Sequence, residues 1–297
     1  MDHRIFATDI EAPEGPIALP DGSMYVTEMS AATSRVTRLD PAGRPTVIKA
    51  TGGRPNGLAL DGDGMIWVAE ALLRAVICLD PGGREVVRVD GDADGRFLFP
   101  NDLAFGPDGL LYLTDTGMVA ADFISGQDFK PGFMDFPWDG KIYAIDPRAG
   151  RVVRRFDGGI RFTNGIAFDA DHKLYANASL PGDIYRYDVF GPGEPDRQPF
   201  GNVLQPHDRT GFTGPDGMAF GEDGRLYCTV YGQSNVTVLD REGHVAERLP
   251  LQGSDPTNVA FSLQKPELLV TEVSVGWVER LPAPCLGLAL HYPKLGR

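Results

Sequence analysis

The sequence predicts an all-β fold, a six-bladed β-propeller built from four-stranded antiparallel blades. Three observations support it. One hairpin plan recurs six times, the 37 Gly and 24 Pro residues suit many short strands joined by turns, and no segment has the pattern of an ordinary amphipathic helix. A repeat of about 40 residues with four short strands is typical of a propeller blade. The six copies begin at Glu14, Asn56, Asn101, Asn164, Asp216 and Thr257.

The clearest copy of the repeat runs from Phe99 to Gly117. It contains a short apolar run at Leu103–Phe105, a Pro-Asp-Gly turn, and a return strand that begins at Leu111. We call the first polar residue of each copy its leading residue. The two strands of the hairpin are strand A, the innermost in a blade, and strand B.

The second copy shows all four strands of a blade. They are predicted at Gly57–Leu60, Met65–Ala69, Ala75–Asp80 and Glu85–Val89. Equivalent third strands, or C strands, are predicted at Val36–Asp40, Lys141–Asp146, Ile184–Asp188, Val236–Asp240 and Gly276–Leu281.

The two ends of the chain are expected to close the ring. The last copy has three predicted strands, and a spare strand, Arg4–Ile10, precedes the first copy. We predict that this strand pairs into the final blade, which removes an exposed edge. Residues 1–297 are therefore expected to form a single propeller domain.

Two segments lengthen the repeat. Residues 118–139 join strands B and C of blade three, and most of the segment between Gly191 and Gly214 precedes blade five. In an antiparallel blade, the start of strand A and the end of strand B lie on the same rim of the disc. Both segments are therefore expected to rise over the face that carries the leading residues. A lid or specificity loop is one interpretation, and decoration of the disc is the other.

The first segment is rich in aromatic residues. These residues indicate a more apolar pocket than a free sugar acid requires, although packing of the segment onto the disc would also account for some of them. They are Phe123, Phe129, Phe133, Phe136 and Trp138.

Composition narrows the function classes. The net charge of −13 leaves no basic footprint for nucleic acid or an anionic membrane. Three widely spaced cysteines, Cys78, Cys228 and Cys285, disfavour a disulfide framework or a zinc-thiolate site. The N-terminal segment lacks an apolar signal core, so a cytoplasmic protein is expected, as a monomer or small homo-oligomer.

The leading residues are the candidates for chemistry. The start of each innermost strand points into the mouth of a propeller's channel, so these oxygen-bearing side chains should converge. Carboxylates and carboxamides are hard donors that suit Ca²⁺, whereas Mg²⁺ prefers a regular octahedron and Zn²⁺ prefers His or Cys. Asn and Asp before Gly are also ordinary turn residues. Their recurrence at one offset in six copies, with Glu14 among them, favours a site.

Several motifs resemble the senescence-marker-protein/gluconolactonase (regucalcin-like) family of six-bladed propellers, related to diisopropylfluorophosphatase and paraoxonase. The motifs are Glu14-Gly15-Pro16, Pro100-Asn101-Asp102, Asn164-Gly165 with Phe162 before it, and Asp216-Gly217-Met218. The resemblance implies that Glu14, Asn164 and Asp216 bind a divalent metal. It implies that Asn101 either ligates the metal or touches substrate. Family members hydrolyse sugar lactones, and some cleave organophosphates.

The function expected from this resemblance is a divalent-metal-dependent hydrolase that opens lactones with activated water. Ca²⁺ is the expected cofactor, with Zn²⁺, Mn²⁺ and Mg²⁺ as alternatives, and a small lactone or ester is the expected partner. Asp216 would ligate the metal and take a proton from water, or act as the nucleophile, and Asn101 is the second catalytic candidate. The alternatives are organophosphate or ester hydrolysis at the same metal, and a non-catalytic scaffold with a structural metal.

The sequence departs from the family pattern at one position. Regucalcin-like enzymes carry an Arg that holds the sugar two positions before the blade-three Asn, and here that residue is Phe99. Two histidines are also considered. His207 could relay a proton or could be a solvated loop residue without a role, and His291 could reach one end of the channel.

Overall fold

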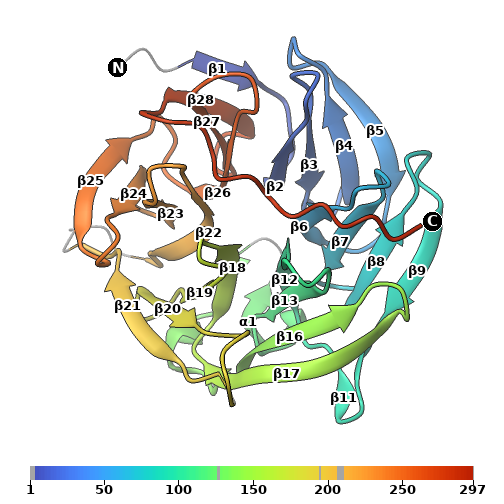
Figure 1. Ribbon diagram of the computed structural model, residues 1–297. Helices are drawn as coiled ribbons and strands as arrows, with labels where there is room; N and C mark the ends of the chain where they lie inside the picture. Colours follow the sequence, from blue (N-terminus) through green and yellow to red (C-terminus); the bar gives the residue numbers. More distant parts are fainter. Residues whose placement is uncertain (1–3, 126–127, 194, 206–210, 297) are drawn as a thin grey trace.

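The computed structural model describes residues 4–125, 128–193, 195–205 and 211–296. Within these residues, six four-stranded antiparallel sheets stand like spokes around one axis (Figure 1). The predicted six-bladed β-propeller is therefore confirmed. None of the helices in the described ranges has the length and apolar character needed to cross a bilayer.

In each of the first five blades, the strands follow the chain outward from the axis. The strands of the first three blades are β2 (Pro13–Ala18), β3 (Met24–Glu28), β4 (Arg35–Leu39) and β5 (Pro45–Ala50); β6 (Pro55–Leu60), β7 (Ile66–Glu70), β8 (Ala75–Leu79) and β9 (Glu85–Val89); and β12 (Pro100–Phe105), β13 (Leu111–Asp115), β16 (Gly140–Asp146) and β17 (Arg151–Ile160).

Blades four and five repeat this order, and in blade six the N-terminal strand β1 takes the outermost place. Their strands are β18 (Thr163–Phe168), β19 (Leu174–Ala178), β20 (Asp183–Tyr187) and β21 (Gln198–Asn202); β22 (Gly214–Phe220), β23 (Leu226–Tyr231), β24 (Asn235–Leu239) and β25 (Val245–Pro250); and β26 (Pro256–Phe261), β27 (Glu267–Glu272), β28 (Trp277–Pro282) and β1 (Arg4–Ala7).

The ring closes as predicted. Strand β1 pairs antiparallel with β28, with Ile5 opposite Glu279, and so completes blade six from the N-terminal end of the chain. Beyond β1, the Ile10 amide donates to the Gly276 carbonyl at 3.0 Å. The pairing covers an edge of β28 that would otherwise be open to other strands.

Four of the predicted C strands end one residue too late. The Asp predicted at the end of each belongs to the following turn, where its side chain accepts hydrogen bonds from main-chain amides of the turn. Asp40, for example, accepts from the amides of Ala42 and Arg44 at 2.8 and 3.0 Å. An Asp that bonds to the backbone two residues on is a turn residue by mechanism.

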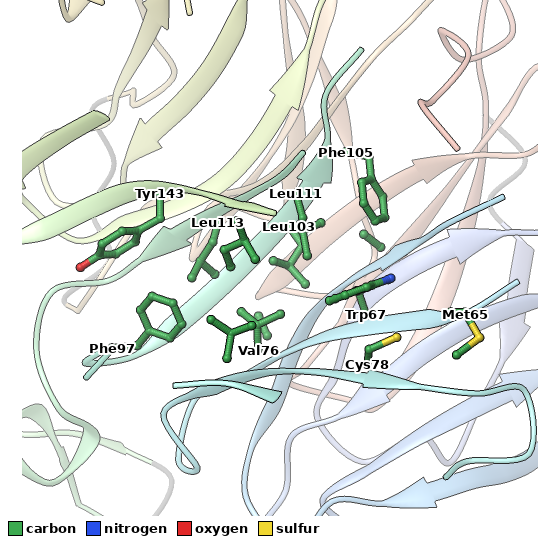
Figure 2. Close-up of a cluster of buried hydrophobic side chains, with 14 of the residues drawn as sticks. Met65, Trp67, Val76, Cys78, Phe97, Leu103, Phe105, Leu111, Leu113 and Tyr143 are labelled. Atoms are coloured by element: carbon green, nitrogen blue, oxygen red, sulfur yellow. The ribbon is translucent and has the colours of Figure 1, made fainter. Parts of the chain in front are cut away.

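The apolar core lies between neighbouring blades. Figure 2 shows the cluster between blades two and three, where Trp67 and Phe105 meet edge to face at 6.2 Å. The Trp67 indole is fully buried and donates to Asp61 at 3.1 Å, which satisfies its one polar atom. The outermost strands are largely exposed, as in β9, so each blade becomes more polar away from the axis.

The C-terminal residues 283–296 cross the face formed by the A–B turns (Figure 1). The Leu288 amide donates to the Phe220 carbonyl in blade five, and the Gly62 amide in blade two donates to the Pro293 carbonyl, both at 2.8 Å. His291 lies on this stretch with His172 beside it, their ring centroids 5.5 Å apart. It lines a cavity at one end of the channel, on the face opposite the leading residues.

Candidate metal centre

A β-bulge re-aims the chain at the start of every innermost strand. The pairing of strands A and B shifts register at or next to the leading residue in all six blades. Such a bulge turns a side chain away from the sheet plane. Pro precedes the leading residue in five blades, and an inner edge strand tolerates its missing N–H. These residues are Pro13, Pro55, Pro100, Pro215 and Pro256.

Side chains of the preceding blade hold several leading residues in place. Thr27, Thr114 and Thr229 donate their hydroxyls to the main-chain carbonyls of the next leading residue at 2.8, 2.5 and 2.8 Å. The Asn177 amide donates in the same way to the Asp216 carbonyl at 2.5 Å. Because these contacts are buried or partly buried, two neighbouring blades fix each of these four leading residues.

The position after the leading residue decides how closely the blades approach. It is Gly in four blades. A Cβ on Gly57 would lie 2.2 Å from Asp102, and one on Gly217 would lie 1.9 Å from Asn258. In blades three and six the position carries those two side chains, which meet in the channel: the Asn258 amide donates to Asp102 at 3.5 Å and to Glu14 at 2.9 Å.

All the predicted site residues line one cavity of about 640 Å³. Glu14, Asn101, Asn164 and Asp216 are among them, and the leading residues of blades two and six complete the set. The cavity lies within the size range of small-molecule sites in proteins. The structure therefore brings together the residues that the repeat singled out, although they span more than two hundred positions.

The site concentrates negative charge. Burial raises the pKa of Glu14 to about 8, and repulsion from Asp102 adds to the shift against opposing contacts from Gly15, Asn258 and Arg54. Burial raises the pKa of Asp102 to about 7. Burial, followed by repulsion from Glu14 and Asp102, raises the pKa of Asp216 well above its usual range, and Asn164 opposes the shift. Three buried carboxylates cannot all ionise here without a cation.

The donor set fits a hard cation. In the described ranges, no group of three or more His, Cys, Asp and Glu side chains is arranged to hold a metal ion. A bound ion would therefore need the amide oxygens of Asn101 and Asn164 beside the carboxylates, a mixture that suits Ca²⁺. The Asn101 amide is oriented by its Nδ2 group, which donates to the Thr116 hydroxyl at 2.9 Å.

Aromatic side chains from both long segments form one wall of the cavity. Phe123 and Phe129 come from the first segment, whose short elements are α1 (Ala120–Phe123), β14 (Ile124–Ser125), β15 (Asp128–Phe129) and η1 (Phe133–Asp135). Phe212 comes from the second and lies 5.3 Å from Phe129 between ring centroids. We call Phe99, Phe123, Phe129, Phe162 and Phe212 the aromatic wall.

The remaining aromatic residues of the first segment pack behind this wall. The Trp138 ring stacks on Phe162 at 4.7 Å, Phe133 stacks on Phe129 at 4.3 Å, and Phe136 packs against the same cluster. Both interpretations of the segment therefore apply to some of its residues. A role as a specificity loop stays a prediction.

Sequence reasoning missed three residues in or next to the site: Asp102, Asn258 and Arg54. Arg54 lines the site cavity, whereas Asp102 and Asn258 lie deeper in the channel and line the cavity at its other end. These two break the Gly of the repeat, and that break was a readable signal. Arg54 gave none, because it lies in a loop outside the hairpin plan. His207 lies outside the described residues, and His291 lies away from this cavity.

Comparison with known proteins gives the family of the chain. A model of the SMP-30/gluconolactonase/LRE-like region matches residues 12–274. The chain belongs to this family. It is 29% identical over 264 residues to a gluconolactonase of Zymomonas mobilis, covering 80% of this chain and 70% of that one. It is 22% identical over 247 residues to the lactonase drp35 of Staphylococcus haemolyticus, covering 82% of this chain and 70% of that one.

Solved structures share the fold of this family member. A gluconolactonase of Xanthomonas campestris superposes with a TM-score of 0.76 at 22% identity, covering 95% of this chain and 89% of that one. The calcium-binding protein regucalcin of Agrobacterium tumefaciens superposes with a TM-score of 0.77 at 19% identity, covering 100% and 98%.

Proposed function

We propose that this protein is a divalent-metal-dependent hydrolase that opens lactones. The observation that carries the proposal is the convergence of Glu14, Asn101, Asn164 and Asp216 on one cavity of about 640 Å³. Burial raises the pKa values of both carboxylates in this set, and repulsion from Asp102 adds to the shift. Family membership and relatives named gluconolactonase and lactonase support the choice of reaction.

Glu14, Asn164 and Asp216 are the proposed metal ligands, with Asn101 as a further ligand or a substrate contact. Ca²⁺ is the preferred ion because the donors are all oxygens, and a structural relative is described as calcium-binding. When bound, a divalent cation stabilises the oxygen that becomes negative as an ester carbonyl is attacked. Uncharged amide ligands leave more of its positive charge for that purpose.

Asp216 is the proposed proton acceptor. Burial, followed by repulsion from Glu14 and Asp102, raises the pKa of this carboxyl, which makes it a stronger base than an exposed Asp. The Asn177 contact to its main-chain carbonyl and the Asn164 contact to its side chain fix its position. Direct attack by the same carboxylate on the ester carbonyl is the other role open to it.

The aromatic wall narrows the proposed substrates. Phe99 stands where regucalcin-like enzymes carry a sugar-binding Arg, and Phe123 and Phe129 extend the apolar surface above it. Apolar rings gain from burial against such a wall, whereas the hydroxyls of a sugar lose hydrogen bonds to water. Cyclic esters with a flatter, more apolar body are therefore expected to react faster than gluconolactone.

The test is a lactone panel measured before and after chelation. Chelated protein should lose turnover, and added Ca²⁺ or another divalent ion should restore it. Asp216→Asn should lower kcat by about 10²- to 10⁴-fold while the protein stays folded. Glu242→Gln, in an exposed turn of blade five, is the charge-matched control.

Three outcomes would count against the proposal. Full turnover in chelator would show that the reaction does not need a metal. Wild-type rates in Asp216→Asn would show that Asp216 has no catalytic role. Hydrolysis of organophosphate triesters without any lactone would favour the related esterase activity. Metal-dependent stability with no turnover on either panel would favour a scaffold with a structural ion.

A further inference from the structure

The described residues that line the candidate metal cavity include five acidic side chains and one basic side chain, Arg54. It lies two residues before the leading residue of blade two, in the loop that enters β6. Its loop is held firmly. Glu70 accepts from the Thr51 hydroxyl at 2.8 Å and the Leu73 amide at 2.9 Å, and the Ala71 amide donates to the Arg54 carbonyl at 3.0 Å.

The side chain of Arg54 reaches over the mouth of the channel. It interacts electrostatically with Glu14 in blade one and with Tyr231, which ends β23 in blade five. Blades two and five lie on opposite sides of a six-bladed ring (Figure 1). Because Arg54 lines one cavity together with Glu14 and Tyr231, its side chain lies on the side of its blade that faces the axis of the ring.

The guanidinium of Arg54 lacks an acceptor within the described part of the chain. Its Nε atom is buried without a hydrogen-bond partner, and no carboxylate in those ranges lies within ion-pair distance. Two other partly buried arginines, by contrast, are paired with carboxylates: Arg35 with Glu28 and Arg197 with Asp157, both at 2.7 Å. Burial lowers the pKa of Arg54, against opposing contributions from Tyr231, Glu70 and Glu14. An unpaired buried cation is costly, so an acceptor from a ligand would relieve it.

We propose that Arg54 binds a carboxylate carried by the substrate, and that it makes the protein selective for lactones with such a substituent. This inference rests on the proposed function. The planar guanidinium matches a carboxylate with two parallel hydrogen bonds. A single Arg among five acidic lining residues offers too little positive charge for a dianionic phosphate.

The ring of such a substrate would bind in a different part of the cavity from its carboxylate. The aromatic wall takes the apolar face of the ring, and the oxygens of Glu14, Asn164 and Asp216 lie beneath the mouth over which Arg54 reaches. Selectivity would thus come from a charge placed apart from the reacting carbonyl. Arg54 in blade two would supply the polar contact to the substrate that Phe99 in blade three cannot make.

The first test measures binding without turnover. Calcium-loaded protein is titrated by calorimetry with tetrahydrofuran-2-carboxylate and with the neutral tetrahydrofuran-2-carboxamide, neither of which contains an ester. The wild type should bind the carboxylate at least tenfold more tightly. Arg54→Gln should abolish this preference and Arg54→Lys should keep part of it, whereas Arg84→Gln, an exposed control, should keep all of it.

The second test uses the matching lactones, 5-oxotetrahydrofuran-2-carboxylate and its carboxamide. Arg54→Gln should raise KM for the carboxylate about 10- to 100-fold, with a small change in kcat, and should change KM for the carboxamide less than about threefold. Equal losses on both lactones, or equal binding of both ring ethers by the wild type, would overturn the assignment. Carboxylate-selective binding without any lactone turnover would retain the Arg54 site and refute the hydrolase.

Discussion

Replacing Asp102 by Asn should stabilise the metal-free protein at neutral and alkaline pH. The Asp102 side chain is buried in the channel, and its pKa is raised from 3.8 to about 7 by burial. A carboxyl with a raised pKa binds a proton more tightly in the folded than in the unfolded state. The folded protein therefore loses stability as pH rises from about 4 to about 7, and the loss is complete above that range. Asn carries no charge and avoids this loss.

The size of the effect follows from the same contacts. A rise of about three pKa units corresponds to about 4 kcal/mol of destabilisation above pH 7. Asn at this position gives up the acceptor for the Asn258 amide at 3.5 Å, which costs about 1 kcal/mol. It keeps an oxygen for the Leu103 amide, now bonded at 2.8 Å. The net gain of about 3 kcal/mol predicts a rise in Tm of about 5 °C.

The assay is thermal unfolding in chelator at pH 5 and pH 8, with Glu242→Gln as an exposed control. The gain should be large at pH 8, small at pH 5, and reduced at pH 8 by saturating Ca²⁺, which compensates the charge of the carboxylates. A lower Tm for Asp102→Asn at pH 8, or an equal gain at both pH values, would refute the reasoning. The first result would mean that favourable contacts hold the carboxylate ionised.

Two further predictions test the packing around the channel. Gly217→Ala should disrupt the site, because its Cβ would lie 1.9 Å from the Asn258 side chain. Metal affinity measured by calorimetry should fall more than for Gly158→Ala, whose Cβ would come no closer than 3.6 Å to any atom. Truncation after Pro282 should lower Tm by removing the contacts that the tail makes with blades five and two, yet it should leave kcat/KM for lactones within about threefold, since the tail covers the opposite face. A variant Gly217→Ala with unchanged metal affinity, or a truncated protein without turnover, would contradict these accounts.

The propeller architecture could be predicted from the sequence because the same hairpin pattern recurs six times. Each hairpin places apolar residues and turn residues at the same offsets, so errors in one copy are corrected by the others. The closure by residues near Arg4 followed from counting strands, since the last copy lacked a fourth. Strand ends were less predictable, because an Asp such as Asp40 can end a strand or begin a turn.

The candidate site could be predicted from the sequence only where it coincided with the repeat. Glu14, Asn164 and Asp216 stand at leading positions, and the bulges that aim them into one cavity are a property of every blade. Arg54 has no counterpart in the hairpin plan, and only tertiary packing shows where its side chain reaches. The C-terminal segment gave no pattern either, because its contacts are main-chain bonds to turns of distant blades.

The contact that joins the two ends of the ring affects when the metal centre can form. The hydroxyl of Thr257 donates to the Pro13 carbonyl at 2.8 Å, next to Glu14, the first proposed ligand. Because blade one is synthesised before blade six, a nascent chain carries that ligand but lacks the partner that orients it until blade six has emerged from the ribosome. High-affinity ion uptake would then report completion of the ring, and partly synthesised chains would not compete for calcium.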